Sequence, residues 1–229
     1  MRRRIFRTIE IIVFVQLCFS FQGPSNVYSQ SNSSIGVQPL LEREAQTLQS
    51  LIPPSIRPLF LAQDIEQFLQ QLEGHAPDWT QLRHADITEQ SERLFQLNRQ
   101  RDEIRTTKKG VLQQPIAFVW AGILRQYLPE YQGFSLALGP ELTITSWGII
   151  RFKPIDLPDY LVTIPSLTVR EQLLARQQQG EQIEIIVVFM GTLIPDESLI
   201  YAFSHDGQQE GMILPVVSVQ NLLYILKSS

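Results

Sequence analysis

The pattern of hydrophobic and polar positions changes character once along the chain, about halfway. Before this point, apolar residues recur at spacings of three and four from Leu61 to Leu72, and Gly74 follows where a helix C-cap belongs. The pattern therefore predicts a helix over residues 59–73. A second helix is predicted over 87–105, where the apolar stripe is thin. Such a stripe is typical of a helix that packs along one edge of another element.

After Pro115 the hydrophobic periodicity becomes that of β-strands, with β-branched and aromatic residues gathered in short runs. Five strands are predicted, at 116–124, 133–138, 147–152, 183–190 and 212–226. The fourth run is apolar at every position after its second, which predicts a central strand buried on both faces. Between the third and fourth strands, Thr168 to Glu171 form a capping box, and Gly180 marks the end of a helix.

Three strands, a helix and two strands, in this order, resemble the OB-fold, a five-stranded, partly open Greek-key barrel. The expected fold class is α+β, with N-terminal helices followed by a small five-stranded OB-fold-like β-barrel that carries one helix between strands three and four. The alternative is a generic α+β sandwich in which residues 160–164 form a full sixth strand. Because the dense apolar runs lie in residues 111–226, we expect this part to fold without the N-terminal third.

The first 29 residues have the features of an export signal. Four arginines, the last of them Arg7, precede an apolar stretch at 11–21, and Ser29 supplies the small residue expected before a cleavage site. We therefore expect an exported protein, periplasmic or secreted, that begins at Gln30. The alternative is a membrane anchor made by an uncleaved N-terminal helix, although residues 5–21 offer fewer positions than the roughly 20 that a spanning helix needs.

These features predict four segments along the chain. Residues 1–29 are the signal peptide, and residues 30–54, rich in Ser, Asn, Gln and Pro, are a flexible leader. Residues 55–110 form a helical region, and residues 111–229 form the β-rich OB-fold-like domain. The predicted β-rich domain is therefore tethered through the helical region and the leader.

Composition and charge narrow the class of protein. The chain has 229 residues, of which 44% are hydrophobic and 18% charged, values typical of a globular protein. Its formal net charge is −4, and it becomes −7 without the signal, which holds four arginines and one glutamate. Such a surface repels phosphate backbones, so nucleic acid is not an expected partner. The only long apolar stretch lies at the N-terminus, which argues against an integral multi-span membrane protein.

The sequence contains no motif with a known catalytic mechanism, and we expect no cofactor. Its one cysteine, Cys18, lies in the signal, so the mature chain would have no thiol for a disulfide or a metal. The three histidines are His75, His84 and His205, whose spacing matches no helical or hairpin pair of metal ligands. We therefore predict neither a metal site nor catalytic residues.

Candidate ligand-binding residues follow from the barrel interpretation, because two loops would flank the face on which OB-folds bind extended ligands. Aromatic side chains there would supply stacking surfaces, with an arginine beside them. The predicted ligand-binding residues are Tyr127, Tyr131, Trp147, Arg151, Tyr201, Phe203 and His205. The alternative is that these aromatic residues close the mouth of the barrel and that the charges are only solvated.

We expect a non-enzymatic binding or assembly module of the cell envelope, whose partner is a protein, a peptide or an envelope glycan. In a purely structural version of this hypothesis, the 87–105 helix docks on an assembly partner. The alternative function is a hydrolase that uses His205 with Asp206 or Asp196, since a carboxylate can orient and charge an imidazole. A tight turn at 204–207, which contains an Asp-Gly pair, explains the same residues without chemistry.

Overall fold

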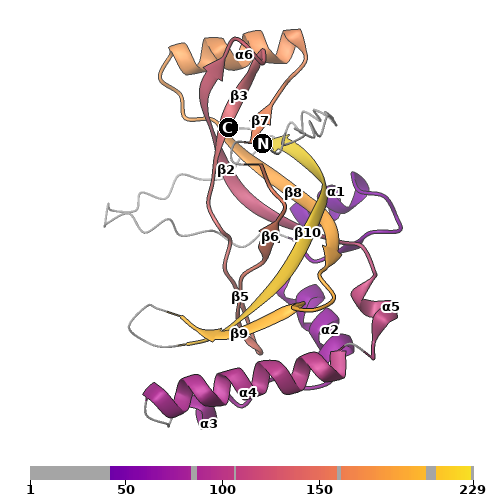
Figure 1. Ribbon diagram of the computed structural model, residues 1–229. Coiled ribbons are helices and arrows are strands. Elements are labelled where there is room, and N and C mark those ends of the chain that lie inside the picture. Colours follow the sequence, from indigo (N-terminus) through magenta and orange to yellow (C-terminus); the bar gives the residue numbers. More distant parts are fainter. Residues whose placement is uncertain (1–41, 84–86, 106, 159–160, 205–209, 228–229) are drawn as a thin grey trace, which may run out of the picture.

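A mixed sheet of ten strands forms the centre of the protein. The computed structural model describes residues 42–83, 87–105, 107–158, 161–204 and 210–227 (Figure 1). The strands are β1 (Arg57–Pro58), β2 (Ile116–Leu128), β3 (Gly133–Leu138), β4 (Thr143–Thr145), β5 (Gly148–Ile150), β6 (Lys153–Ile155), β7 (Val162–Thr163), β8 (Glu184–Leu193), β9 (Leu199–Phe203) and β10 (Gly211–Leu226). The three longest strands, β10, β8 and β2, are neighbours and pair antiparallel.

The sheet is open, which corrects the prediction of a five-stranded OB-fold-like barrel. The strand order is β4-β5-β10-β8-β2-β3-β7, so the two edges of this path are short strands that do not pair, whereas a barrel must join its edges. Strand β10 explains the difference, because it is sixteen residues long and continues through Pro215 without a break. Its residues 211–215 pair with β9 and β5, its residues 216–218 pair with β6, and its residues 217–226 pair with β8. The strands are thereby spread along β10 instead of closing on one another.

The segment that the sandwich alternative read as a full sixth strand contributes only two residues among those described. These residues form β7, which pairs with Phe134 and Ser135 of β3. The predicted third strand, 147–152, is observed only as β5, and β6 follows it as a separate strand that was not predicted. Both strands run parallel to β10 and pair with it at two separate places. The strand-rich half supplies β2 to β10, and β1 from the N-terminal side completes the ten-stranded mixed sheet.

The helices of the described residues are α1 (Glu42–Ser50), α2 (Ala62–Glu73), α3 (Trp79–Arg83), α4 (Ile87–Arg105), α5 (Lys109–Leu112) and α6 (Leu167–Gln178). Helices α2, α4 and α6 confirm the three helices predicted from the hydrophobic pattern. Helix α1 lies inside the segment expected to be a flexible leader. In the described part of the chain, none of the helices combines the length and the apolar character needed to cross a membrane.

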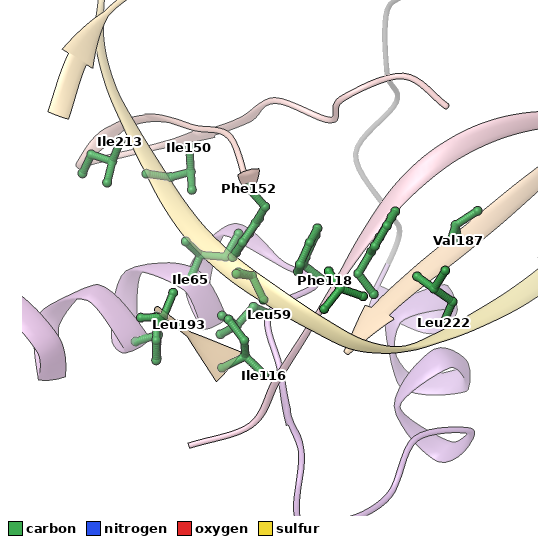
Figure 2. Packing of buried hydrophobic residues seen from close by; sticks show 14 of the residues in the cluster. Leu59, Ile65, Ile116, Phe118, Ile150, Phe152, Val187, Leu193, Ile213 and Leu222 are labelled. Carbon is green, nitrogen blue, oxygen red and sulfur yellow. The ribbon is translucent and has the colours of Figure 1, made fainter. Parts of the chain in front are cut away.

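One face of the sheet carries the larger hydrophobic core. The ring of Phe118 stacks there on the rings of Phe152 and Phe189, at centroid distances of 4.4 and 5.0 Å. Figure 2 shows Phe118 and Phe152 among the aliphatic side chains of this core. Helix α2 packs four fully buried side chains into this core, namely Ile65, Phe68, Leu69 and Leu72. The spacing of these four residues places them on one side of the helix. The helical region therefore completes the core of the sheet.

The opposite face carries a smaller core, because neighbouring residues of a strand point to opposite sides of the sheet. Ala45 and Leu48 of α1 belong to this cluster, together with Val119 of β2 and Val188 of β8. Val187, the neighbour of Val188, belongs to the larger core, and both valines are fully buried. The prediction that the fourth apolar run is a central strand buried on both faces is therefore confirmed.

Candidate functional site

Three of the predicted ligand-binding residues meet around Trp79 of α3. The indole of Trp79 lies 6.1 Å from the Tyr201 ring and 5.7 Å from the Phe203 ring, measured between ring centroids. Its Nε1–H donates a 2.7 Å hydrogen bond to the backbone oxygen of Trp147. Gly211 leaves room for the indole, because a Cβ there would lie 2.0 Å from the Trp79 ring. Trp79 thus joins α3 to β9 and to the turn between β4 and β5.

The other predicted binding residues are not part of this group. Tyr127 lies on β2, where its ring is 5.2 Å from the ring of Phe134. Tyr131 is exposed in the turn between β2 and β3, and Arg151 is exposed directly after β5. The structure therefore divides the predicted set, instead of placing it on one binding face.

Of the three residues of the hydrolase alternative, the structure describes only Asp196. His205 and Asp206 lie outside the described residues, and Asp196 is exposed in the loop between β8 and β9. Among the described residues, no group of three or more His, Cys, Asp and Glu side chains could hold a metal ion. The hydrolase therefore stays a prediction from the sequence.

Tyr201 is 2% exposed, and its hydroxyl belongs to a buried ionic network that we call the Glu73 cluster, made of Glu73, Arg101, Arg105 and Tyr201. Arg101 Nη1 donates to Glu73 Oε2 at 3.0 Å and to the Tyr201 hydroxyl at 3.1 Å. Arg105 Nη1 donates to Glu73 Oε1 at 2.8 Å. Both guanidinium groups also lie over the Tyr201 ring, at 5.1 and 5.9 Å from its centroid.

The Glu73 cluster is structural rather than a ligand site. Burial, reinforced by the charge of Glu73, raises the pKa of Tyr201, with Arg101 opposing, so the hydroxyl stays neutral near pH 7. Glu73 belongs to α2, the two arginines to α4 and the tyrosine to β9. The cluster therefore connects α2 and α4 to β9. Its side chains are buried, so they offer no surface to a ligand.

Helix α4 also bonds to the outer edge of β9. The side-chain amide of Asn98 receives a 2.8 Å hydrogen bond from the backbone N–H of Tyr201 and donates one of 3.0 Å to its backbone oxygen. Arg105 Nη2 donates to the backbone oxygen of Leu199 at 3.1 Å. These side chains take the place of a further strand, which protects an edge that would otherwise offer unpaired backbone groups.

A groove of about 650 Å³ opens where the chain passes from α1 into β1, a volume within the usual range of ligand sites. We call it the Arg57 groove. It is lined by Gln49, Ser50, Ile52, Pro53, Pro54, Ser55, Ile56, Arg57, Pro58, Gln71 and Gln114. Three of these side chains are amides and two are hydroxyls, and the only charged group is the guanidinium. The groove can therefore offer both hydrogen-bond donors and acceptors, together with one positive charge.

Arg57 is held in place from several sides. Its backbone N–H donates a 2.9 Å hydrogen bond to the oxygen of Pro115, at the start of the pairing between β1 and β2. Its guanidinium lies 5.2 Å from the centroid of the Phe68 ring, and its Nη1 donates to Gln71 Oε1 at 2.5 Å. Burial lowers the pKa of Arg57, whereas the charge of Asp64 acts in the opposite direction.

Sequence reasoning did not find the Arg57 groove. Its residues come from the end of the segment expected to be a flexible leader, from residues 55–58 directly after it, from α2 and from Gln114 just before β2. The Pro53-Pro54 pair was the only local signal, and it indicates a turn without indicating a ligand. The groove exists because β1 joins the edge of β2 and brings these segments together.

Comparison of the chain with family models, with curated proteins and with solved structures finds no match.

Proposed function

We propose that this protein is an exported, non-enzymatic binding module of the cell envelope, and that its ligand occupies the Arg57 groove. The observation that carries the proposal is the lining of the groove. The eleven residues supply amides, hydroxyls, prolines, two isoleucines and one guanidinium, and none of them is a histidine, cysteine, aspartate or glutamate. Such a lining can bind and orient a polar ligand, but it offers no nucleophile activated by a base.

The position of the groove supports binding as well. Two of its walls are secondary-structure elements. Helix α2 packs on the larger core, and β1 pairs with β2. A site on such elements keeps its geometry without a ligand, which lowers the entropy lost on binding. The export signal predicted at residues 1–29 places the ligand among the proteins, peptides and glycans of the cell envelope.

The test is the thermal unfolding of the exported form, which should begin at Gln30, with and without a panel of short peptides and envelope glycan fragments. A ligand at about ten times its Kd stabilises the folded state by about 1.4 kcal/mol and raises Tm. Ser55→Trp places an indole at the exposed rim of the groove and should abolish this rise. Ser91→Trp makes the same change at an exposed position of α4 and should leave the rise unchanged.

Two results would contradict the proposal. If Ser55→Trp leaves ligand binding intact, the ligand binds outside the Arg57 groove. If the protein cleaves a panel member and His205→Ala abolishes the cleavage, the hydrolase alternative replaces the binding module.

A further inference from the structure

Arg57 is a half-buried cation that lacks a carboxylate partner among the residues that the structure describes. By contrast, Arg101 and Arg105 both pair with Glu73, and Arg176 pairs with Glu181. The negative charge of Asp64 acts to raise the pKa of Arg57, yet the two side chains form no ion pair. The guanidinium loses only part of its hydration, and an anionic ligand in the groove would supply the counter-charge that no described residue provides in an ion pair.

The guanidinium is also fixed in one place before any ligand arrives. The β1 backbone, the Phe68 ring and the Gln71 amide restrain it together. Only one of its nitrogens, Nη1, donates a hydrogen bond to a described residue. A guanidinium carries five N–H donors, so several of them are available to a group that enters the groove. Two parallel N–H donors match the two oxygens of a carboxylate.

We propose that the Arg57 groove binds a peptide segment through a carboxylate, which pairs with the guanidinium of Arg57. This inference rests on the proposed function and names the class of ligand for the same site. The amides of Gln49, Gln71 and Gln114 accompany the arginine along the groove. Each side-chain amide has one acceptor and two donors, and it can pair with the N–H and C=O groups of a peptide backbone.

The lining favours a peptide over an acidic glycan. Sugar rings and other extended ligands with flat apolar faces are commonly held by aromatic side chains, because the ring face is large and apolar. None of the eleven lining residues is aromatic. Proline and isoleucine side chains are present instead, and they suit contact with small aliphatic groups of a peptide.

The probe is N-acetyl-tetraalanine with a free C-terminal carboxylate, compared with the same peptide as its C-terminal amide. Both are added to the exported form at about 10 mM, and thermal unfolding is recorded. We expect the acid to raise Tm by about 2 to 4 °C and the amide to give at most about a third of that rise. Arg57→Gln should remove the difference between the two peptides.

Three comparisons make the result specific. Arg57→Lys keeps a positive charge without the planar fork, and it should retain only part of the rise. Arg125→Gln removes a charge from an exposed position of β2 outside the groove, and it should retain all of the rise. N-acetyl-tetraalanine should also protect better than inorganic phosphate at the same concentration, because the proposed site recognises the peptide together with its carboxylate.

Equal shifts by the acid and the amide, both abolished by Ser55→Trp, would overturn the carboxylate assignment while leaving the proposed function standing. No shift with either peptide, or a larger shift with inorganic phosphate, would also overturn the assignment. A rise that persists in Arg57→Gln and in Ser55→Trp would show that the peptide binds elsewhere, and it would count against the proposed function as well.

Discussion

Single residues decide how two of the four arginines of α4, Arg101 and Arg105, can be buried. The side chains of Glu73 and Arg105 are 2% and 1% exposed, and Glu73 gives one carboxylate oxygen to each arginine. Buried charges are tolerated when they are paired and hydrogen-bonded, but they become strongly unfavourable when the partner is removed. Glu73 is therefore the residue on which the attachment of α4 depends most.

The first prediction is that Glu73→Gln lowers the free energy of unfolding by about 3 to 5 kcal/mol, because it removes the counter-charge of the buried Arg101 and leaves Arg105 with only the partly exposed Asp102 as its ionic partner. Urea denaturation of the variant measures this loss. Glu92→Gln is the matched control, since Glu92 is an exposed glutamate of α4 that accepts a hydrogen bond from Gln96. Its effect should stay within about 0.5 kcal/mol. Equal stabilities for the two variants would mean that the Glu73 cluster does not hold α4.

A second prediction concerns Glu141, in the loop between β3 and β4. Burial raises the pKa of Glu141 from 4.5 to about 7, although the charge of Lys227 opposes the rise. The folded state then binds a proton more tightly than the unfolded state, so this residue lowers stability as the pH rises from about 4.5 to about 7. Glu141→Gln cannot ionise and should remove this loss, which is on the order of 1 kcal/mol because solvent screens a partly exposed group.

The measurement is the free energy of unfolding as a function of pH. Glu141→Gln should gain stability relative to the wild type between about pH 4.5 and about pH 7, and keep that gain above this range. Glu130→Gln, which removes one exposed carboxylate from the turn between β2 and β3, corrects for the change in net charge. A constant difference between Glu141→Gln and the wild type at all pH values would contradict the prediction.

At the scale of elements, the thin apolar stripe of α4 correctly predicted a helix that lies along an edge. The structure identifies the edge as that of β9, and the contacts are largely polar. Ile104, one of the few apolar residues of α4, is 55% exposed, whereas Arg101 and Arg105 are buried. Hydrophobic periodicity did not predict the burial of the two arginines, because arginine is normally a surface residue and its burial here depends on a carboxylate supplied by another helix.

At the scale of the whole molecule, the N-terminal helices and the sheet share their cores. Helix α2 completes the larger core and α1 covers the smaller one on the opposite face. Helix α6 lies at one end of the sheet, and α4 lies at the other (Figure 1). Without these helices, residues 111–226 would expose apolar faces of the sheet, which argues against the expectation that this part folds alone.

The third prediction reverses that expectation: the 111–226 fragment should not unfold cooperatively. Exposing one large apolar side chain costs about 1.5 to 3 kcal/mol, so losing the four buried residues of α2 is comparable with the whole stability of about 5 to 15 kcal/mol. Circular dichroism melts compare the fragment with residues 42–229. A sharp, reversible transition in the fragment would show that the sheet is stable without α1 and α2.

The sequence by itself determined the local elements, because their signals are local. The spacing of apolar residues predicted α2, α4 and α6. The run that is apolar on both faces of a strand predicted the central strand β8. It did not determine the strand order, since one apolar run can pair with several others at similar cost. Two features of β10 make the sheet open. The strand continues through Pro215, and it pairs in parallel with β5 and β6.

The candidate site was decided entirely by the tertiary structure. Arg57, Gln71 and Gln114 have no common sequence signal, and they meet because β1 pairs with β2 beside α2. Tyr201 and Trp147 were chosen from the sequence as ligand-binding residues on the basis of their chemistry, yet packing against α3 and α4 buries both of them. Residue type indicates what a side chain can bind, whereas its neighbours in space determine whether it is free to do so.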